Sequence, residues 1–522
     1  MLFPRDLVAR CATNFPDKVA YYCGPEYRTW RQMHLRSDAL AGAMAELGLG
    51  KGDSVAILGQ ESFEIYEHFF ACMKMGAMRV GVNWRYTPAQ LLHILSDSAA
   101  KAVLVQATCL PLIQSCRAEI DRMGILLIGY GGRHPFARDY ESLLARSSGL
   151  ICLPELDPED PLLCTYTSGT TGNPKGVAHK QAAIAKMIFQ SLVSRGLSPD
   201  DIWYTAAASS WMTVVLNMLG LGNGMSHIIM DGRFDIAQFL RDIETRRATA
   251  VMLVPTMIRR AIEECRRARY DLSSVRLLMY GSSPATPQLI REAYETFGCE
   301  LIQSYGMTEG GWLCHLSASD HRRAMQSEPD LLKSVGRLGV MSEVSIRDPE
   351  GNPVPPGTLG DVWIRGETLM KGYLNLPQET AAVLRGDWLC TNDVGYVDHR
   401  GYLFLTDRKQ FMIITGAVNI FPSSIETIIA EHPAVEEVAV VGAPHPEWGE
   451  AVAAVVKLRN RTERFPISEL HRFCEGRLNR LEQPKYLYFI EEFPRSANGK
   501  IQKQEVKNWI AANVAMPPQE LA

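Results

Sequence analysis

The chain has 522 residues, too many for a single compact core, and at roughly 100–200 residues per domain it predicts two to four structural units. Its 54 Lys and Arg nearly balance 58 Asp and Glu, so the net charge of −4 gives no argument for binding nucleic acid or an anionic membrane. The 12 cysteines form no CxxC pair and no cluster with zinc-ligand spacing, which favours a reducing compartment.

The amino-terminal stretch lacks the pattern of a signal peptide. Pro4, Arg5 and Asp6 interrupt it before an apolar core of sufficient length can form. No run in the chain approaches the roughly 20 apolar residues of a membrane helix. We therefore expect a cytoplasmic protein without a membrane span.

Short apolar runs then alternate with amphipathic patterns up to residue 340. The expected strands are 54–59, 101–106, 125–130, 162–167, 226–231, 250–255 and 275–281, and two expected helices are 64–77 and 283–298. Strands that alternate with helices indicate parallel sheets covered on both faces. The expected fold class is α/β, with a large N-terminal domain of αβα-layered parallel sheets.

The pattern changes in the last third of the chain. Pro and Gly cluster at 347–361, and short alternating runs follow, which predicts a β-rich subdomain at about 340–407. From residue 408, the runs VEEVAVVGAP and EAVAAVVKL look like strands and ISELHRFCEGRL looks like a helix. We therefore predict an N-terminal domain at 1–407 and an α+β C-terminal domain at 408–522.

Residues 167–176 read TSGTTGNPKG and directly follow an expected strand. Glycines let the backbone turn tightly and point N–H groups at an anion, and Lys175 adds a positive charge. Hydroxyl donors are supplied by Thr167, Ser168, Thr170 and Thr171. The usual GxxxxGK[ST] loop does not match, because Pro174 precedes the lysine and no Ser or Thr follows it. The stretch predicts a phosphate-binding loop of another type; a plain hydroxyl-rich turn is the alternative.

The longer stretch YTSGTTGNPKGVAHK closely resembles the phosphate-loop signature of the adenylate-forming superfamily, which includes acyl-CoA synthetases, peptide-synthetase adenylation domains and luciferases. Three later stretches resemble motifs of the same superfamily in the same order: YGMTEG, DWLCTNDVGYVDHRGYLFLTDR and PRSANGK. The resemblance covers nearly the whole chain. It implies that an acyl-adenylate is made from a carboxylic acid and ATP with Mg²⁺, that pyrophosphate is released, and that CoA serves as co-substrate.

The resemblance also assigns roles to single residues. It implies ATP binding by Thr167, Ser168, Gly169, Thr170, Thr171, Gly172, Lys175, Gly281, Ser282, Ser283, Tyr305, Gly306, Asp393 and Arg408. Tyr305 would stack on adenine, and Asp393 would bind the ribose; Asn392 stands before it where most relatives have glycine. The implied catalytic residues are Thr308 at the α-phosphate, Glu309 as the Mg²⁺ ligand, and Lys500 between the substrate carboxylate and the α-phosphate. A carboxylate beside a polyphosphate requires a metal, since like charges otherwise repel.

The stretch GSSPATPQ at 281–288 stands where relatives have a turn along the adenine and acyl pocket. Small residues there permit close approach of a ligand. The same stretch also reads as the start of a helix, with Ser283 or Thr286 as its cap. The two interpretations are compatible.

A first departure from the resemblance lies at 209–219, SSWMTVVLNML. Relatives have an aromatic residue followed by His here, and the His position falls at Trp211. Trp cannot act as a base, so it would form a pocket wall or gate a tunnel; a core Trp is the alternative. The neighbouring Met and Val residues favour a lipophilic acid. The expected acyl pocket or tunnel comprises Trp211, Met212, Gly281, Gly306 and Gly310.

A second departure lies at the hinge expected near 408–411, about which the C-terminal domain of relatives rotates between adenylation and CoA transfer. The usual Lys is replaced by Gln410 and the hinge acid by Phe411, and the usual glycine pair reads Gly416 and Ala417. A large aromatic side chain at a hinge would bias the equilibrium between the two states. These residues bear on CoA transfer rather than on adenylation.

The leading hypothesis is therefore an AMP-forming acid–thiol ligase that converts a lipophilic carboxylic acid to its acyl-CoA thioester. The alternative is a stand-alone adenylating enzyme that passes the acyl group to an acyl carrier protein or another nucleophile. A luciferase-type oxidation and a nucleotide-binding protein without turnover are further hypotheses; joint retention of Lys175, Glu309, Asp393, Arg408 and Lys500 argues against the last. Nucleic acid is not an expected partner, and a homodimer is expected by analogy with relatives.

Overall fold

The computed structural model describes residues 3–136, 138–149, 152–167, 174–232, 234–408, 411–415, 418–445, 448–460, 463–495 and 500–513. The chain divides into two compact units. The first comprises Met1–Val344 and Ile364–Leu389, and the second comprises Ser345–Trp363 and Cys390–Ala522.

One sheet of the first unit carries the predicted phosphate loop. Within the described residues it has eight strands in the order β19-β9-β8-β4-β3-β5-β6-β7. Their bounds are β3 Ser54–Leu58, β4 Met78–Val82, β5 Ala100–Gln106, β6 Leu126–Tyr130, β7 Arg138–Asp139, β8 Pro161–Thr167, β9 Lys175–Lys180 and β19 Gly372–Tyr373. The run from β8 to β7 is parallel, whereas β9 and β19 are antiparallel. Strands β3 and β4 are buried at every position, which accounts for their nearly continuous apolar sequence.

A second sheet of this unit has nine strands among the described residues, in the order β16-β15-β14-β13-β12-β10-β11-β1-β2. Their bounds are β1 Val19–Cys23, β2 Glu26–Thr29, β10 Ile202–Thr205, β11 Ser226–Ile229, β12 Ala250–Leu253, β13 Leu277–Gly281, β14 Glu300–Met307, β15 Gly311–Leu316 and β16 Arg337–Leu338. The strands from β14 to β1 are parallel, and the outer ones are antiparallel.

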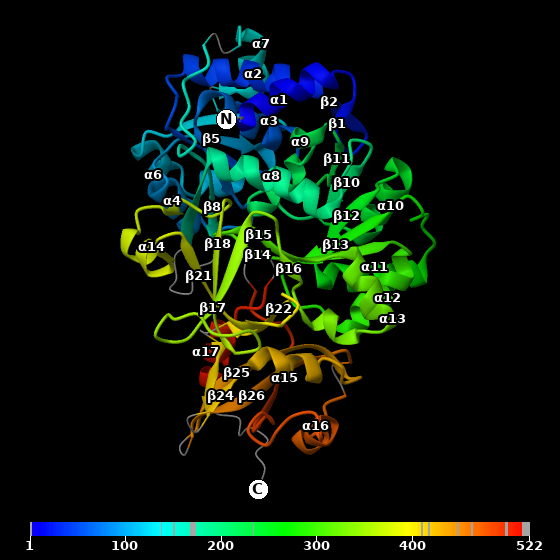
Figure 1. Cartoon of the computed structure of the whole chain (residues 1–522). Coiled ribbons are helices and arrows are strands. Elements are labelled where there is room, and N and C mark those ends of the chain that lie inside the picture. The colour runs from blue at the N-terminus through cyan, green and yellow to red at the C-terminus, as the bar shows by residue number, and fades with distance from the viewer. Residues whose placement is uncertain are drawn as a thin grey trace. The chain divides into compact units, whose positions relative to one another are not determined.

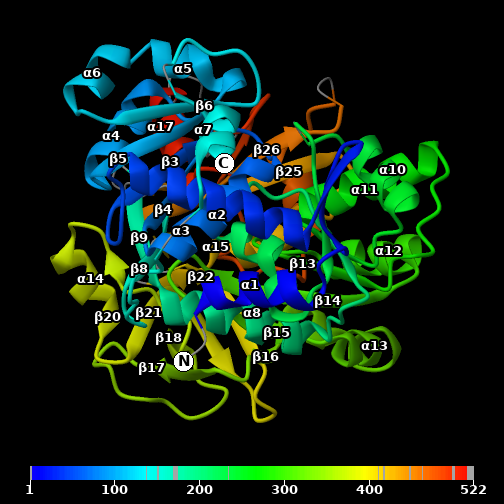
Figure 2. The same ribbon diagram turned by 90° about the horizontal axis from the view of Figure 1, so that it is seen from above.

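Helices cover both sheets. The longer ones are α1 Pro4–Asn14, α2 Trp30–Glu46, α3 Phe63–Met75, α4 Pro88–Asp97, α8 Gln181–Arg195, α10 Ile236–Arg246, α11 Pro255–Arg267, α12 Pro287–Phe297 and α13 Ala318–Gln326; the shorter ones are α5 Leu110–Gln114, α6 Arg117–Arg122, α7 Tyr140–Arg146, α9 Gly220–Asn223 and α14 Pro377–Val383. Three 3₁₀ turns in the described residues are η1 Ala107–Cys109, η2 Met212–Met218 and η3 Pro329–Lys333. Helix α8 contacts β8 and β9 of one sheet and β15 of the other, so it packs between the sheets (Figures 1 and 2).

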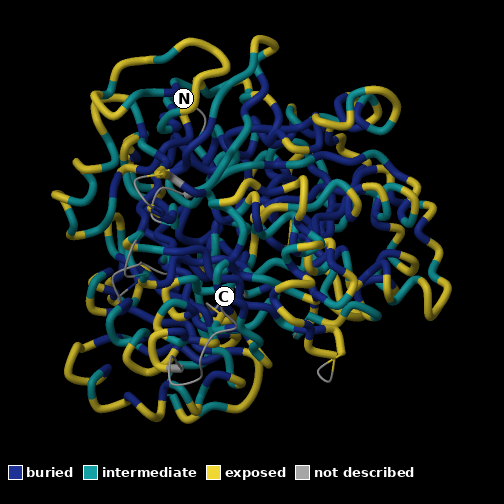
Figure 3. Tube along the Cα trace, turned by 90° about the horizontal axis from the view of Figure 1, so that it is seen from below, coloured by how far each residue is buried: buried dark blue, intermediate teal, exposed yellow. Residues whose placement is uncertain are grey.

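The main hydrophobic core lies where these helices meet the sheets. It includes Trp30, Phe69, Met187 and Val215, each at most 1% exposed. Figure 3 shows buried residues in the interior of the trace and exposed residues at its periphery. Each of the 12 cysteines is free and most are buried.

A smaller sheet within the described residues has the order β17-β18-β21-β20, with β22 beside β21. Its bounds are β17 Ser342–Arg347, β18 Gly360–Gly366, β20 Leu384–Arg385, β21 Trp388–Val397 and β22 Leu403–Arg408. The second unit ends in a further sheet, with the order β24-β23-β26-β25 and with β27 parallel to β26. The bounds are β23 Ile413–Thr415, β24 Val418–Ile420, β25 Val435–His445, β26 Gly449–Leu458, β27 Tyr486–Phe489, α15 Pro422–Ile429, α16 Ile467–Cys474 and α17 Lys503–Asn513.

The predicted α/β fold class, with large parallel sheets and a smaller C-terminal domain, is confirmed. The expected strands are present with shifts at their ends, but the helix expected at 283–298 begins only at Pro287. Thr286 is its cap and accepts a hydrogen bond from the Leu289 N–H, whereas Ser283 is exposed. Ser282 has a φ of +68°, which is incompatible with a helical turn at that point. No described helix is long and apolar enough to cross a membrane.

Candidate active site

Strands β8 and β9 hold both ends of the predicted phosphate loop. Thr167 ends β8 and Lys175 begins β9, and the two residues lie opposite each other in the antiparallel pair. The predicted loop residues Ser168, Gly169, Thr170, Thr171 and Gly172 lie outside the described residues. The loop therefore leaves and re-enters the sheet through adjacent, hydrogen-bonded strands.

Lys175 contacts two side chains from a later part of the chain. Its ammonium forms an ion pair with the Glu379 carboxylate of α14 and lies 5.5 Å from the ring centroid of Tyr373. Tyr373 reaches this position because β19 pairs with β9, with Tyr373 opposite Val177. Tyr373 and Glu379 were not predicted from the sequence, because their segment, KGYLNLPQET, contains no spacing that points to them.

Tyr373 connects Lys175 to the predicted metal ligand. Its hydroxyl donates to Glu309 Oε1 over 2.9 Å. Burial raises the pKa of Tyr373, and the nearby Glu309 carboxylate raises it further, so the phenol keeps its proton and remains a donor. The Glu309 carbonyl also accepts from the Met370 N–H over 2.7 Å. Glu309 is thus held through both its side chain and its main chain.

The YGMTEG stretch forms the turn between β14 and β15. Met307 pairs with Gly311, so Thr308, Glu309 and Gly310 form the tip of a hairpin. The Thr308 carbonyl lies 2.7 Å from His179 Nε2. Because a carbonyl only accepts, His179 carries its proton on Nε2 and donates it. Burial lowers the pKa of His179 to about 4, so it is neutral at physiological pH.

Three predicted glycines differ in how much space their surroundings leave for a side chain. A Cβ on Gly281 would overlap the Ser304 carbonyl oxygen, and one on Gly306 would overlap the Gly311 carbonyl oxygen. A Cβ on Gly310 would meet only a Leu313 methyl at 3.1 Å. Glycine is therefore required where the main chains of β13, β14 and β15 approach most closely, at the strand ends where α/β sheets bind ligands. Tyr305, on β14, is half-buried.

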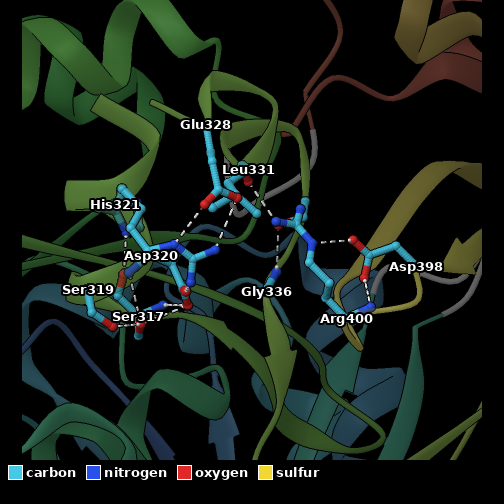
Figure 4. Close-up of polar contacts among 11 residues, drawn as sticks. Ser317, Ser319, Asp320, His321, Glu328, Leu331, Gly336, Asp398 and Arg400 are labelled. Carbon is cyan, nitrogen blue, oxygen red and sulfur yellow. Dashed lines mark hydrogen bonds and ion pairs between the residues drawn. The ribbon is translucent and has the colours of Figure 1, made fainter. Parts of the chain in front are cut away.

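A buried histidine anchors β13 just before Gly281. His321 Nδ1 donates to the Ser317 carbonyl and its Nε2 accepts from the Tyr280 hydroxyl, each over 2.9 Å. Burial lowers the pKa of His321 to about 4, consistent with a neutral ring in this tautomer. Ser317 and Asp320 cap the start of α13 through reciprocal hydrogen bonds (Figure 4). This arrangement fixes the carboxyl end of β13.

Trp211 lies at the start of η2 and is half-buried. Its ring packs edge-on against Tyr86, with centroids 6.3 Å apart. Met212 is buried, and its Sδ accepts a hydrogen bond from Thr165 Oγ1 over 3.7 Å. The apolar residues that follow, Val214, Val215, Leu216 and Met218, belong to the main core and are 0% exposed. Core packing accounts for their apolar character.

The second unit carries the predicted ribose ligands. Asp393 on β21 lies opposite Arg408 on β22, and the side chain of Arg408 lies outside the described set. Asp393 is buried, and its N–H donates to Thr391 Oγ1 over 3.1 Å. Asn392 has a φ of +60°, a conformation that Asn and Gly tolerate. The backbone here therefore accepts Asn in place of glycine.

The second unit also carries Phe411 and Lys500. Phe411 is half-buried, and Lys503 Nζ lies 5.4 Å from its ring centroid while forming an ion pair with Glu426. Lys500 is exposed. Gln410, Gly416 and Ala417 lie outside the described residues.

Comparisons with known proteins place this geometry in a family. Residues 8–374 match the AMP-binding enzyme family, and residues 424–500 match the AMP-binding enzyme C-terminal domain. The chain belongs to the AMP-binding enzyme family. It is 33% identical over 511 residues to the indoleacetate–CoA ligase of Aromatoleum aromaticum, covering 97% of this chain and 96% of that one. It is 32% identical to the fatty acid–[acyl-carrier-protein] ligase ScoC of Streptomyces coeruleorubidus, covering 95% and 94%.

A solved structure agrees with these matches. The amide bond synthetase McbA from Marinactinospora thermotolerans superimposes with a TM-score of 0.86 at 29% identity, covering 97% of this chain and 99% of that chain. The predicted membership of the adenylate-forming superfamily is confirmed, as is the prediction of an AMP-forming ligase. This family of enzymes uses ATP.

Proposed function

We propose that this AMP-binding enzyme activates a lipophilic carboxylic acid with ATP, releases pyrophosphate, and transfers the acyl group to CoA. The observation that carries the proposal is the chain of contacts from Lys175 through Tyr373 to Glu309. These contacts position the Lys175 ammonium at the end of the phosphate loop and the Glu309 carboxylate at the β14–β15 turn. One charge is suited to phosphate oxygens, and the other is suited to a metal that accompanies them.

The reaction overcomes the poor electrophilicity of a carboxylate. A carboxylate oxygen attacks the α-phosphorus of ATP, and the bond from that phosphorus to the oxygen bridging to the β-phosphate breaks. Pyrophosphate leaves, and the acid becomes bonded to AMP, which is a good leaving group. In this proposal Lys175 and the loop neutralise the departing phosphates, and the Thr308 hydroxyl donates to the α-phosphate. Lys500 offsets charge as the carboxylate meets the phosphate.

The residues present fit a Mg²⁺ ion that binds together with the nucleotide. Among the described residues only Tyr373 donates to the Glu309 carboxylate, and it uses Oε1, so Oε2 can take a cation. The described residues contain no group of three or more His, Cys, Asp or Glu that could hold a metal by themselves. Mg²⁺ commonly binds through one carboxylate plus substrate phosphates. When bound, it would supply positive charge to the phosphate oxygens.

Three further residues are proposed to contact ATP. Asp393 would accept hydrogen bonds from the ribose hydroxyls, Arg408 would contact ribose or phosphate, and Tyr305 of the first unit would stack on adenine. The domains proposed from the sequence, 1–407 and 408–522, would meet at a hinge near 408–411. Phe411 would bias rotation there.

The acceptor of the acyl group has a second candidate. One relative is an acyl-carrier-protein ligase, and a similar structure is an amide bond synthetase. Together with Phe411 at the expected hinge, these relatives favour delivery to a carrier protein or an amine as the alternative to CoA.

A paired assay tests the proposal. Pyrophosphate release is measured with ATP and each of indoleacetic, octanoic, anthranilic and ferulic acids, and thioester formation is then measured after CoA is added. We expect release with at least one acid. Lys175→Met should reduce release at least about tenfold, because a charge-assisted contact is lost. Lys186→Met is the matched control, because Lys186 pairs with Glu367 in the same unit but has no proposed contact with ATP. Failure of every acid, or equal effects of the two variants, would contradict the proposal.

A further inference from the structure

A charged side chain lies buried inside the eight-stranded sheet. Arg79, on β4, is 1% exposed, and its Nη2 donates to the Ser209 carbonyl over 3.0 Å. Its Nε and Nη1 are buried without a hydrogen-bond partner among the described residues. Burial lowers the pKa of Arg79 only to about 10, so the guanidinium is charged at neutral pH. Buried N–H groups without partners are costly, and such groups often mark a site for a water, ion or ligand.

Glu61 supplies the compensating charge. Its Oε1 accepts from the Ser209 N–H over 2.6 Å, and its Oε2 accepts from the Tyr66 hydroxyl over 2.9 Å. The Tyr66 oxygen in turn accepts from Asn217 Nδ2, which directs the Tyr66 proton toward Glu61. Burial raises the pKa of Glu61, whereas the hydrogen bonds from Ser209 and Tyr66 and the nearby charge of Arg79 lower it. Two accepting oxygens are the pattern of an ionised carboxylate. Arg79 and Glu61 therefore balance each other in charge.

A small cavity lies beside this pair. Its volume is about 10 Å³, and its lining includes Gly59, Glu61, Arg79, Gly81, Trp84 and Ser210. Ser210 Oγ is also buried and has no hydrogen-bond partner among the described residues. A Cβ on Gly81 would lie 2.7 Å from Arg79 Nη1 and 3.0 Å from the Ser210 Cα. The glycine thus leaves space between Arg79 Nη1 and the main chain of Ser210.

The cavity is lined in part by Ser209 and Ser210, the residues that lead into the expected wall of the acyl pocket. Ser210 directly precedes Trp211, and the peptide groups of Ser209 are held by Glu61 at the N–H and by Arg79 at the carbonyl. This contact positions the segment that carries Trp211. The contact with the Ser209 carbonyl uses only Nη2 of the guanidinium. It does not explain why Arg79 Nε and Nη1 and the Ser210 hydroxyl are buried without hydrogen-bond partners among the described residues.

We propose that this cavity receives a neutral oxygen of the acid substrate, such as a hydroxyl or carbonyl oxygen, and that Arg79 and Ser210 select acids that carry it. The inference rests on the proposed function. The room suits a single water-sized group, and Glu61 already neutralises Arg79, so a second carboxylate fits neither the volume nor the charge. A hydrocarbon at this point would leave buried donors unpaired, which is how a polar site rejects the analogue that lacks the oxygen.

Matched acids test the selectivity. Values of kcat/KM for pyrophosphate release are compared between octanoic and 8-hydroxyoctanoic acids, and between 3-phenylpropanoic and 3-(4-hydroxyphenyl)propanoic acids. We expect a preference of about tenfold or more for the hydroxylated member of at least one pair, as for a hydrogen bond to a charged donor. Arg79→Met should bring the ratio close to one.

Because Arg79 also holds Ser209, a variant that leaves those contacts intact is needed. Ser210→Ala keeps the Ser209 contacts of Glu61 and Arg79 and should lower the preference about threefold or more. Ser37→Ala is its control, because Ser37 is buried but bonded to the Met33 carbonyl in α2. It should leave the preference unchanged.

Calorimetric binding of the same acids without ATP separates this inference from the proposed function. The preference should appear in binding, and Ser210→Ala should reduce it. Discrimination in binding without any pyrophosphate release would contradict the proposed function alone. Equal binding and turnover of both members of both pairs, or an unchanged preference in Ser210→Ala, would show that the cavity holds only a water and would overturn the inference.

Discussion

Replacing Tyr373 by Phe isolates the contact that joins the phosphate-loop lysine to the proposed metal ligand. The substitution removes the hydroxyl that donates to Glu309 Oε1 over 2.9 Å and keeps the ring beneath Lys175. The positive charge at the loop should therefore be little affected. What changes is the orientation of the Glu309 carboxylate.

The size of the effect follows from the exposure and charge of the two groups. A hydrogen bond to an ionised acceptor contributes about 1.5–3 kcal/mol, and both side chains are half-buried, which places this bond near the lower limit. About 1.5 kcal/mol corresponds to roughly tenfold. Loss of a residue that orients a metal ligand typically costs about 10–100-fold in metal affinity. We therefore expect the half-saturating Mg²⁺ concentration to rise about tenfold.

The assay is acid-dependent pyrophosphate release titrated with Mg²⁺ at saturating ATP. Excess Mg²⁺ should largely restore the rate of Tyr373→Phe, because the carboxylate itself is retained. Tyr204→Phe is the matched control: Tyr204 is buried and donates to the Asp242 carboxylate over 2.7 Å, and neither residue has a proposed role in the reaction. An unchanged Mg²⁺ requirement in Tyr373→Phe, or an equal shift in Tyr204→Phe, would refute the reasoning.

Three further predictions test neighbouring parts of the site. Gly306→Ala should lower pyrophosphate release about 100-fold or more, because the hairpin must shift, whereas Gly310→Ala should stay within a few-fold; similar losses would count against the close approach. Lys500→Ala should lower adenylate formation at least about 100-fold while transfer from a supplied adenylate to CoA persists, and normal adenylation would exclude its proposed role. Burial lowers the pKa of His179 from 6.5 to about 4, so its contribution to stability is complete above pH 6.5 and is lost as the pH falls toward 4. Denaturant titrations would measure the free energy of unfolding as the pH is lowered from 6.5 to 4. Over this range the wild type should lose up to about 3 kcal/mol more than His179→Gln. Parallel pH curves of the two proteins would contradict this.

The sequence was sufficient for the features that depend on local pattern. Apolar runs such as 54–59 and 250–255 are strands because their residues must be buried on both faces of a parallel sheet. The helix expected at 283 illustrates the limit of such patterns. Thr286 and Pro287 are a strong start signal, but the apolar periodicity alone placed the start four residues too early.

Contacts between distant segments could not be read from the sequence. Tyr373 and Glu379 reach Lys175 only because β19 pairs with β9 across almost 200 residues of chain, and nothing in either segment specifies that pairing. Arg79 is visible in the sequence as an arginine within an apolar strand. Its role could not be predicted, because it depends on contacts around Glu61 and Ser209. The roles of the loop residues at 168–173 stay predictions.

The pairing of β19 with β9 also couples the two proposed phosphate contacts. Tyr373 belongs to β19, so its position is fixed by pairing with β9, the strand that begins with Lys175. Its hydroxyl donates to Glu309 at the tip of the β14–β15 hairpin. His179, four residues along β9 from Lys175, donates to the Thr308 carbonyl of the same tip. The hairpin is thus tied to β9 on both sides of the Thr308–Glu309 peptide. A displacement of β9 would move the loop lysine, the hydroxyl of Thr308 and the carboxylate of Glu309 together, which is what the positioning of a polyphosphate and its metal requires.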